Sequence, residues 1–406
     1  MQAKITNLTK PQKTCYNETM STPIVIHPNI NTTKKTDLLS LTLPQLEQWL
    51  IERGEAPFRA KQIYSWLYRQ LVTDFSAMTN LPQSLRNRLS EEASIGPMIV
   101  RSELHSKDDR TRKILLELAD GKLVESVLML YPPLGDSSAR ATVCVSSQAG
   151  CAFGCTFCAT GQMGFDRHLS AGEIVAQVLY FARELRAAPW VAAGLPGSMP
   201  IDHITNIVLM GMGEPLHNYD NVLQALRILN ASEGFNLGAR HMTVSTVGLV
   251  PAIRKLSQEP LQVNLAISLH APTDELRSQT MPVNRKYPLS ELLAACQDYI
   301  TATRRQVTFE YVLLAGVNDT PTYAHQLGEL LAPLKQFAHV NCIPVNATSA
   351  DYRPPTGEAI RAFRDILSEH GVSNSVRAER GDDIAAACGQ LRTRFEKSRR
   401  VAHVSS

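Results

Sequence analysis

The stretch Cys144-Val-Ser-Ser-Gln-Ala-Gly-Cys151-Ala-Phe-Gly-Cys155-Thr-Phe-Cys158-Ala-Thr-Gly161 decides how the chain folds. Three of its cysteines, Cys151, Cys155 and Cys158, are separated by three and then two residues. Thiolates grouped in one short loop can hold three corners of a [4Fe–4S] cluster, because thiolate is the usual ligand of such iron. The fourth iron of that cluster would stay open to a small molecule.

A structural zinc knuckle is the main alternative for this loop. Such sites are usually closed by four ligands, and His168 is the nearest spare donor beside the three cysteines. We therefore expect an iron–sulfur cluster, with Phe157 as an apolar shield beside the last ligand.

Strand and helix patterns alternate from about residue 140 onward. Apolar runs predict strands over 142–146, 204–210, 242–247, 263–269, 308–314 and 340–345. Amphipathic segments predict helices over 171–186, 219–230, 250–257, 289–303, 323–334 and 358–370. Apolar strands with helical crossovers indicate a parallel sheet, so we expect an α/β fold built as a partial (β/α)6 barrel. Its active site should lie at the C-terminal ends of the strands, where the cysteine loop falls.

The rest of the chain divides by composition and pattern. We expect a mobile extension over 1–36, a helical accessory domain over 37–97, an antiparallel strand lid over 98–139, a core over 140–391 and a basic tail over 392–406. The accessory helices are predicted at 45–51, 57–68 and 82–93, and a seventh core strand at 374–379.

Composition limits the possible functions. The 406 residues contain no apolar run of about 18 residues, so no membrane span is expected. The start of the chain does not resemble a signal peptide, and the eight cysteines are unevenly placed, which together favour a reducing cytoplasmic location. The net charge of +3 is too small to indicate nucleic-acid binding by itself. Basic clusters over 101–113 and 392–400 can meet phosphates, although on sequence alone a solvated surface or a basic tail explains them better.

Three further motifs accompany the cysteine loop: Gly211-Met-Gly-Glu-Pro215, Ser268-Leu-His-Ala-Pro272 and Arg380-Gly-Asp-Asp-Ile-Ala-Ala-Ala-Cys-Gly-Gln-Leu391. Together these motifs resemble the RlmN/Cfr family of radical S-adenosylmethionine (SAM) RNA adenine methylases, over about residues 37–391. Within that family the chain is most similar to the RlmN branch. The resemblance implies the six-unit barrel, a [4Fe–4S] cluster held by the three loop cysteines, and two molecules of SAM per turnover.

The resemblance also implies the SAM contacts, which fall at strand ends as a barrel site requires. It assigns them to Gly213, Glu214, Ser245, Ser268, Leu269, His270 and Asn346. Glycines allow a backbone to approach a ligand closely, and a carboxylate at this point can accept hydrogen bonds from an ammonium group. The segment 347–355 after the last of these contacts departs from the family pattern.

Three catalytic residues follow from the resemblance. Cys388 would accept a methyl group, Cys144 would be the resolving thiol that forms a transient disulfide with it, and Glu125 would be the proton acceptor. On local pattern alone the two cysteines read as small core residues and Glu125 as an exposed strand residue.

The family implies methylation of adenine C2 in 23S rRNA and in tRNA, at the base just 3′ of the anticodon. It further implies an electron donor such as flavodoxin or ferredoxin, a disulfide reductant and a monomeric enzyme. One alternative is the same chemistry aimed at adenine C8, as in the Cfr branch. Another is a non-catalytic iron–sulfur RNA-binding protein, although binding alone has no use for Cys144 or Cys388.

Overall fold

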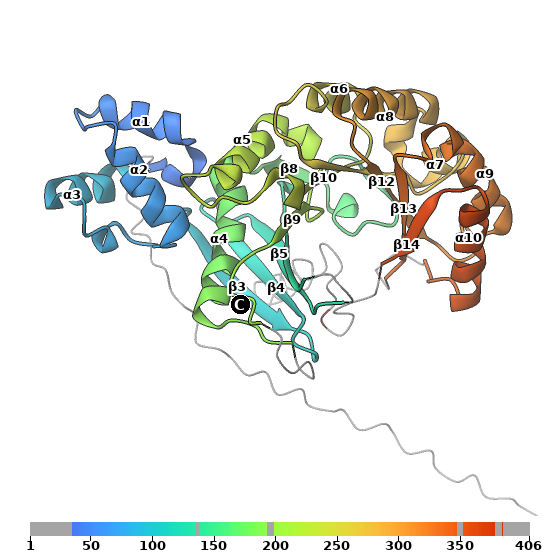
Figure 1. Ribbon diagram of the computed structural model, residues 1–406, viewed down its shortest axis with the longest axis horizontal. Coiled ribbons are helices and arrows are strands. Elements are labelled where there is room, and N and C mark those ends of the chain that lie inside the picture. The colour runs from blue at the N-terminus through green and yellow to red at the C-terminus, as the bar shows by residue number, and fades with distance from the viewer. Residues whose placement is uncertain (1–34, 135–137, 193–198, 347–351, 378–383, 385–406) are drawn as a thin grey trace, which may run out of the picture.

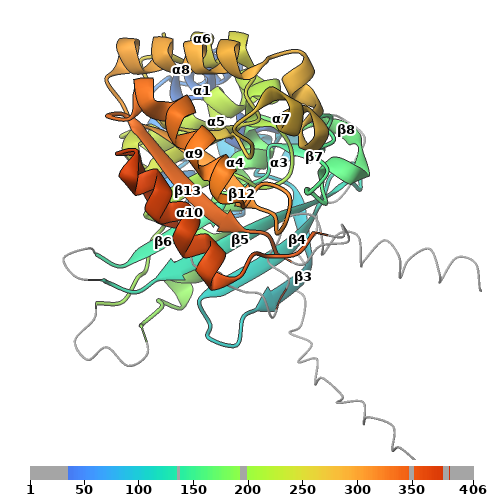
Figure 2. The same ribbon diagram turned by 90° about the vertical axis from the view of Figure 1, so that its right-hand side faces the viewer.

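The computed structural model describes residues 35–134, 138–192, 199–346, 352–377 and 384. A ten-stranded mixed sheet runs through it in the order β14-β13-β12-β11-β10-β9-β6-β5-β4-β3. The N-terminal helices and the last helices, α9 and α10, lie at opposite ends of the molecule (Figure 1). The helices that follow the parallel strands cover the outer face of the curved sheet (Figure 2).

The parallel part of the sheet forms the predicted core. Its strands are β6 (Arg140–Cys144), β9 (Asn206–Leu209), β10 (Met242–Thr246), β11 (Asn264–Ser268), β12 (Val307–Leu313), β13 (Ala338–Pro344) and β14 (Ser373–Val376). The connecting helices are α4 (Ala171–Ala187), α5 (Tyr219–Asn230), α6 (Val250–Leu256), α8 (Leu289–Thr303), α9 (Pro321–Leu331) and α10 (Gly357–Glu369). The strands are short, apolar and largely buried. This composition is expected because helices cover one face of the sheet and the packed interior of the barrel covers the other. The expected α/β barrel fold is confirmed.

Three antiparallel strands extend this sheet beyond its first parallel strand. They are β3 (Met98–His105), β4 (Thr111–Leu118) and β5 (Leu123–Tyr131). β5 pairs with β6 and sets Val127 opposite Cys144. The strands predicted as a lid are therefore hydrogen-bonded to the barrel, and this pairing brings Glu125 beside the end of β6.

The N-terminal helices pack through apolar faces that are continuous with the core of the barrel. They are α1 (Leu43–Ile51), α2 (Arg59–Tyr64), which continues into a π-helical turn at Ser65–Arg69, and α3 (Gln83–Glu92). A short parallel pair, β1 (Thr36–Asp37) and β2 (Ala93–Ser94), joins the two ends of this segment. Leu46, Leu50, Ile63 and Leu67 are fully buried, so one face of each helix supplies the packing that the sequence pattern predicts.

Smaller elements complete the described chain. The hairpin of β7 (Gln148–Gly150) and β8 (Phe165–His168) flanks the cysteine loop, and α7 (Asp274–Thr280) follows β11. Short 3-10 helices occupy Leu38–Ser40, Phe75–Ala77, Gly161–Met163, Pro215–Asn218, Ala239–His241, Pro282–Arg285 and Ala332–Leu334. Among the described helices, none combines the length and the apolar character that a membrane crossing requires.

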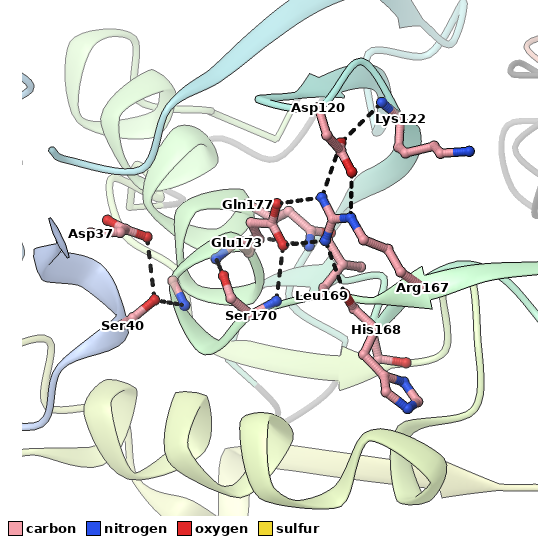
Figure 3. Close-up of polar contacts among 12 residues, drawn as sticks. Asp37, Ser40, Asp120, Lys122, Arg167, His168, Leu169, Ser170, Glu173 and Gln177 are labelled. Carbon is pink, nitrogen blue, oxygen red and sulfur yellow. Dashed lines mark hydrogen bonds and ion pairs between the residues drawn. The ribbon is translucent and has the colours of Figure 1, made fainter. Parts of the chain in front are cut away.

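A polar junction fixes the hairpin against the helices (Figure 3). The Arg167 guanidinium donates to both carboxylate oxygens of Glu173 at 2.8 Å and to those of Asp120 at 2.6 and 3.1 Å. Glu173 also belongs to the capping box that starts α4. The adjacent Gly172 N–H donates to Ser40 Oγ at 3.0 Å. The N-terminal helices, α4, β8 and the turn after β4 therefore meet at one point.

Candidate active site

One cavity of about 620 Å³ lies at the C-terminal ends of the parallel strands. Most of the predicted site residues line it: Glu125, Cys144, Cys151, Cys155, Cys158, Gly213, Glu214, Ser245, Ser268, His270 and Asn346. Leu269 does not, because its side chain is fully buried in the core. Cys388 lies outside the described residues. Several separate segments between residues 125 and 346 thus contribute to one cavity, as expected for the site of a barrel.

The cysteine loop is shaped by its own backbone and by the hairpin beside it. The Cys151 N–H donates to the Gly164 carbonyl at 2.8 Å, and the Cys158 N–H donates to the Cys155 carbonyl at 3.1 Å. Gly150 has φ +75°, and a Cβ there would lie 2.0 Å from the Gly164 carbonyl oxygen. A glycine is therefore required where β7 turns into the loop.

The three loop thiols are free and occupy a largely apolar setting. Met281, Val283 and Phe157 pack around Cys155. Burial raises the pKa of Cys151 to about 11, and burial also raises the pKa of Cys155, with the Cys158 thiolate adding to both shifts. Thiols of this kind release their protons readily only to a metal that replaces the lost hydration.

The donor set fits an iron–sulfur cluster. Within the described ranges, no three His, Cys, Asp or Glu side chains converge closely enough to hold a single metal ion. A cluster binds each thiolate through a different iron, so it suits thiols that are spread around one loop better than a lone zinc ion does.

Glu214 lies at the end of the loop after β9 and is 2% exposed. Its Oε2 accepts from the Val247 N–H at 2.8 Å, and its Oε1 accepts from the Leu216 N–H at 3.0 Å. Burial raises the pKa of this carboxyl to about 7, against the lowering effect of those backbone donors. The oxygens are thus held by the backbone at the cavity wall, where they can accept from a ligand ammonium.

The two glycines beside Glu214 are required by packing of the chain against itself. A Cβ at Gly213, where φ is +96°, would lie 2.4 Å from Gln148 Cβ. A Cβ at Gly211 would lie 2.7 Å from the Val145 carbonyl oxygen. The sequence interpretation attributed these glycines to close approach of a ligand, whereas the atoms they approach belong to the segment after β6.

Gln148 holds this corner together and was missed by the sequence interpretation. Its Oε1 accepts from the Glu214 N–H at 2.8 Å. Its Nε2 donates to Nδ1 of His168 at 3.0 Å and to Nδ1 of His217 at 3.1 Å. His168, considered as a spare metal ligand, therefore directs Nδ1 toward an amide.

His270 leaves β11 in a left-handed conformation, with φ +57°. Its Nδ1 accepts from the Val312 N–H at 2.9 Å, which places the ring proton on Nε2. Burial, with the nearby Arg277, lowers the pKa of His270 to about 3, so the ring is neutral. A neutral imidazole with Nε2–H at a cavity wall can donate one hydrogen bond to a ligand.

The other end of the cavity combines a thiol with buried charges. Glu125 is 3% exposed, so the reading as an exposed strand residue is wrong. Its Oε1 lies 3.4 Å from Nζ of Lys113, which is also fully buried. Burial raises the pKa of Cys144 to about 11, with Arg377 opposing the shift. Lys113 therefore lies in the interior and is not part of a phosphate-binding surface.

Lys113, Arg377 and Glu310 also belong to this site, and the sequence interpretation did not select them for it. Arg377 and Glu310 line the cavity. Of the three, only Lys113 could have been noticed in the sequence, because it directly precedes the apolar run at the end of β4. Glu310 lies in the middle of β12 and Arg377 directly follows β14, and the pairing of these strands could not be read from sequence.

The fold and the site define a class of protein: the chain is a radical SAM enzyme. A family model for the radical SAM superfamily matches residues 199–325. The model of the ribosomal RNA large subunit methyltransferase N-terminal domain matches residues 36–95.

Relatives extend the likeness to most of the chain. A probable dual-specificity RNA methyltransferase RlmN from Geobacillus thermodenitrificans is 48% identical, over 89% of this chain and 93% of its own length. A protein of the same description from Chloroflexus aurantiacus is 50% identical, over 87% and 92%. The crystal structure of a radical SAM methyltransferase from Sphaerobacter thermophilus superposes with a TM-score of 0.80 and 49% identity, covering 87% and 98%.

The chain therefore belongs to the RlmN family of radical SAM RNA methyltransferases. It is a SAM-dependent RNA methyltransferase, and the radical SAM superfamily implies SAM and a [4Fe–4S] cluster as its cofactors.

Proposed function

We propose that this enzyme methylates adenine C2 in 23S rRNA and in tRNA. One observation carries the proposal: the three-thiol loop, Cys144 and Glu125 line the same cavity. A methyltransferase that attacks a nucleophilic atom needs no such set of thiols. Adenine C2 is not nucleophilic, so its methylation calls for a radical route and for protein groups that form and break a covalent link. The relatives' description as dual-specificity RNA methyltransferases supports two RNA substrates.

Cys151, Cys155 and Cys158 would hold the cluster. SAM would lie between it and the strand ends, where Gly213, Glu214, Ser245, Ser268, His270 and Asn346 line the cavity. Glu214 would accept from the ammonium group of SAM, and the contribution of Leu269 would be limited to its backbone. The bound cofactors supply a 5′-deoxyadenosyl radical, and the protein positions that radical and excludes water from it.

Cys388 would carry the methyl group. Its thiolate would take a methyl from a first SAM, and a hydrogen atom would leave that methyl for the radical that a second SAM would supply. The remaining carbon radical adds to adenine C2 and forms a thioether between RNA and Cys388. The adduct would then give its C2 proton to Glu125 and one electron to an oxidised one-electron carrier such as flavodoxin or ferredoxin, which restores the aromatic base.

Cys144 would release the product. Its thiolate attacks the sulfur of Cys388, the carbon–sulfur bond breaks, and the departing carbon takes a proton to become the methyl group. A Cys144–Cys388 disulfide remains and needs two electrons from a disulfide reductant. Flavodoxin or ferredoxin would supply the separate single electron that each radical cleavage consumes.

Mass spectrometry of nucleosides tests the proposed reaction. RNA from cells that lack the gene, with and without a complementing copy, is digested after separation into 23S rRNA and tRNA. We expect 2-methyladenosine in both fractions only when the gene is present. Formation of 8-methyladenosine would assign the chain to C8 chemistry, and the absence of any gene-dependent methyladenosine would contradict the proposal.

A further inference from the structure

Arg277 is a fully buried cation whose hydrogen-bond partners are all neutral. It belongs to α7 and has no exposed surface. Its Nε donates to the Leu269 carbonyl at 3.1 Å, and Nη2 donates to the carbonyls of Val247 and Ser268 at 2.8 and 3.1 Å. Nη1 donates to Asn284 Oδ1 at 2.9 Å. The donors are satisfied, but hydrogen bonds to carbonyls leave the net positive charge uncompensated.

A buried charge normally needs an opposite charge nearby. None of the ion pairs found among the described residues includes Arg277. Burial lowers its pKa to about 10, and the anionic groups that oppose this shift are Cys155, Asp274 and Cys296. Of these, only Cys155 belongs to the cysteine loop that lines the cavity.

The end of α7, the helix that carries Arg277, and the residue after it contact the cysteine loop. The Thr156 N–H donates to the Thr280 carbonyl at 3.0 Å, and Met281 packs on Cys155. Two of the three carbonyls that Arg277 binds belong to Val247 and Ser268, which line the cavity, whereas Arg277 itself does not line it. The guanidinium therefore stands directly behind the wall and has no place to contact a ligand.

We propose that Arg277 is the buried counter-charge of the iron–sulfur centre and that it raises the reduction potential of the cluster. The inference rests on the proposed ligation by Cys151, Cys155 and Cys158. Reduction moves one electron from an external donor onto the cluster and makes the three-thiolate centre more negative by one charge. A fixed positive charge nearby stabilises the reduced form more than the oxidised form, because cluster potentials follow local charge and hydrogen bonding.

A redox titration of the cluster tests this role. Full-length protein is reconstituted anaerobically and titrated with dithionite and mediators, without SAM, while electron paramagnetic resonance measures the reduced cluster. Arg277→Gln keeps hydrogen-bond donors but removes the charge, and Arg277→Lys keeps the charge. At the wild-type midpoint we expect the ratio of reduced to oxidised cluster in Arg277→Gln to fall from one to about one third or less. Arg277→Lys should stay close to wild type.

Two outcomes overturn the inference. An unchanged midpoint in Arg277→Gln shows that the charge does not act on the cluster, and equal shifts in Gln and Lys variants assign Arg277 to scaffolding alone. Arg305→Gln is the matched control, because this half-buried arginine precedes β12 at the N-terminal edge of the sheet. It should leave the midpoint unchanged.

A second variant decides the question if Arg277→Gln does not fold. Asn284→Asp places a carboxylate beside the intact guanidinium and neutralises it, so the midpoint should fall; an unchanged midpoint overturns the inference. Asn284→Ser removes the same amide without adding a charge and should not lower the midpoint. Failure of the underlying assignment is distinguishable, because wild type would then form no cluster, or Cys155→Ala would still form one.

Discussion

Glu214 links the burial of a single carboxyl to the binding of SAM. Because burial raises its pKa to about 7, the carboxylate that can accept from an ammonium group predominates only above that pH. Acidification through this pKa protonates the acceptor. We therefore expect the SAM affinity of cluster-loaded protein to fall about tenfold between pH 8 and pH 6.

Equilibrium dialysis with labelled SAM measures this dependence. Glu214→Gln should bind SAM weakly and with little change over the same range, since the amide does not titrate. A wild-type affinity that is constant from pH 8 to pH 6 would rule out Glu214 as the titrating contact.

At the residue scale, sequence reasoning finds groups that lie in short strings and misses groups defined by distant partners. Cys151, Cys155 and Cys158 form a recognisable spacing, and Glu214 stands in a Gly-rich motif. Gln148 acquires its role through Glu214 and His217, which are 66 and 69 positions away. Arg277 was missed for a different reason, because three of its four partners are backbone carbonyls, which no side-chain pattern reveals.

At the scale of elements, the polar junction in Figure 3 sets the first turn of α4 against the N-terminal 3-10 helix that contains Ser40. A Cβ at Gly172 would lie 1.9 Å from Asp37 Oδ2 and 2.5 Å from Ser40 Oγ. Gly172→Ala should therefore push the N-terminal helices away from α4 and lower the free energy of unfolding by about 1–3 kcal/mol.

Thermal and denaturant unfolding measure this effect. Gly357→Ala is the matched control, because it also lies in the first turn of a helix and its nearest neighbour would be a flexible arginine tip at 3.5 Å. If both variants unfold alike, the contact between α4 and the N-terminal helices contributes nothing measurable.

Elements with a clear local pattern were predictable, and elements without one were not. α5 was expected at residues 219–230 and has those bounds, because twelve residues carry a clear amphipathic period. α7 and the β7–β8 hairpin were missed, since each is too short to show a period and depends on packing beside the cysteine loop. The second N-terminal helix was expected to be regular from residue 57 to residue 68, but it changes to a π-helical turn at Ser65.

At the scale of the whole molecule, the cavity joins parts of the chain that sequence reasoning treated separately. The parallel barrel could be predicted, because its strands and helices alternate regularly. That β3, β4 and β5 continue the same sheet could not, since strand pairing leaves no local pattern. This continuity brings Glu125, with the buried Lys113 beside it, to the cavity that contains Cys144.

The central claim is that Cys144 resolves a covalent link between RNA and Cys388. Cys144→Ala removes the only proposed attacking thiolate, so the thioether should form and persist. Cys388→Ala should form no link at all. Cys342→Ala is the control for loss of a buried cysteine, since Cys342 is buried on β13 and does not line the cavity.

A denaturing gel of each variant, purified from growing cells and run with and without ribonuclease, measures the link directly. We predict a ribonuclease-sensitive upward shift for Cys144→Ala that is absent from wild type, from Cys342→Ala and from the Cys144→Ala/Cys388→Ala double variant. Cys144→Ala protein that shows no shift while cells still make methylated RNA would contradict the account.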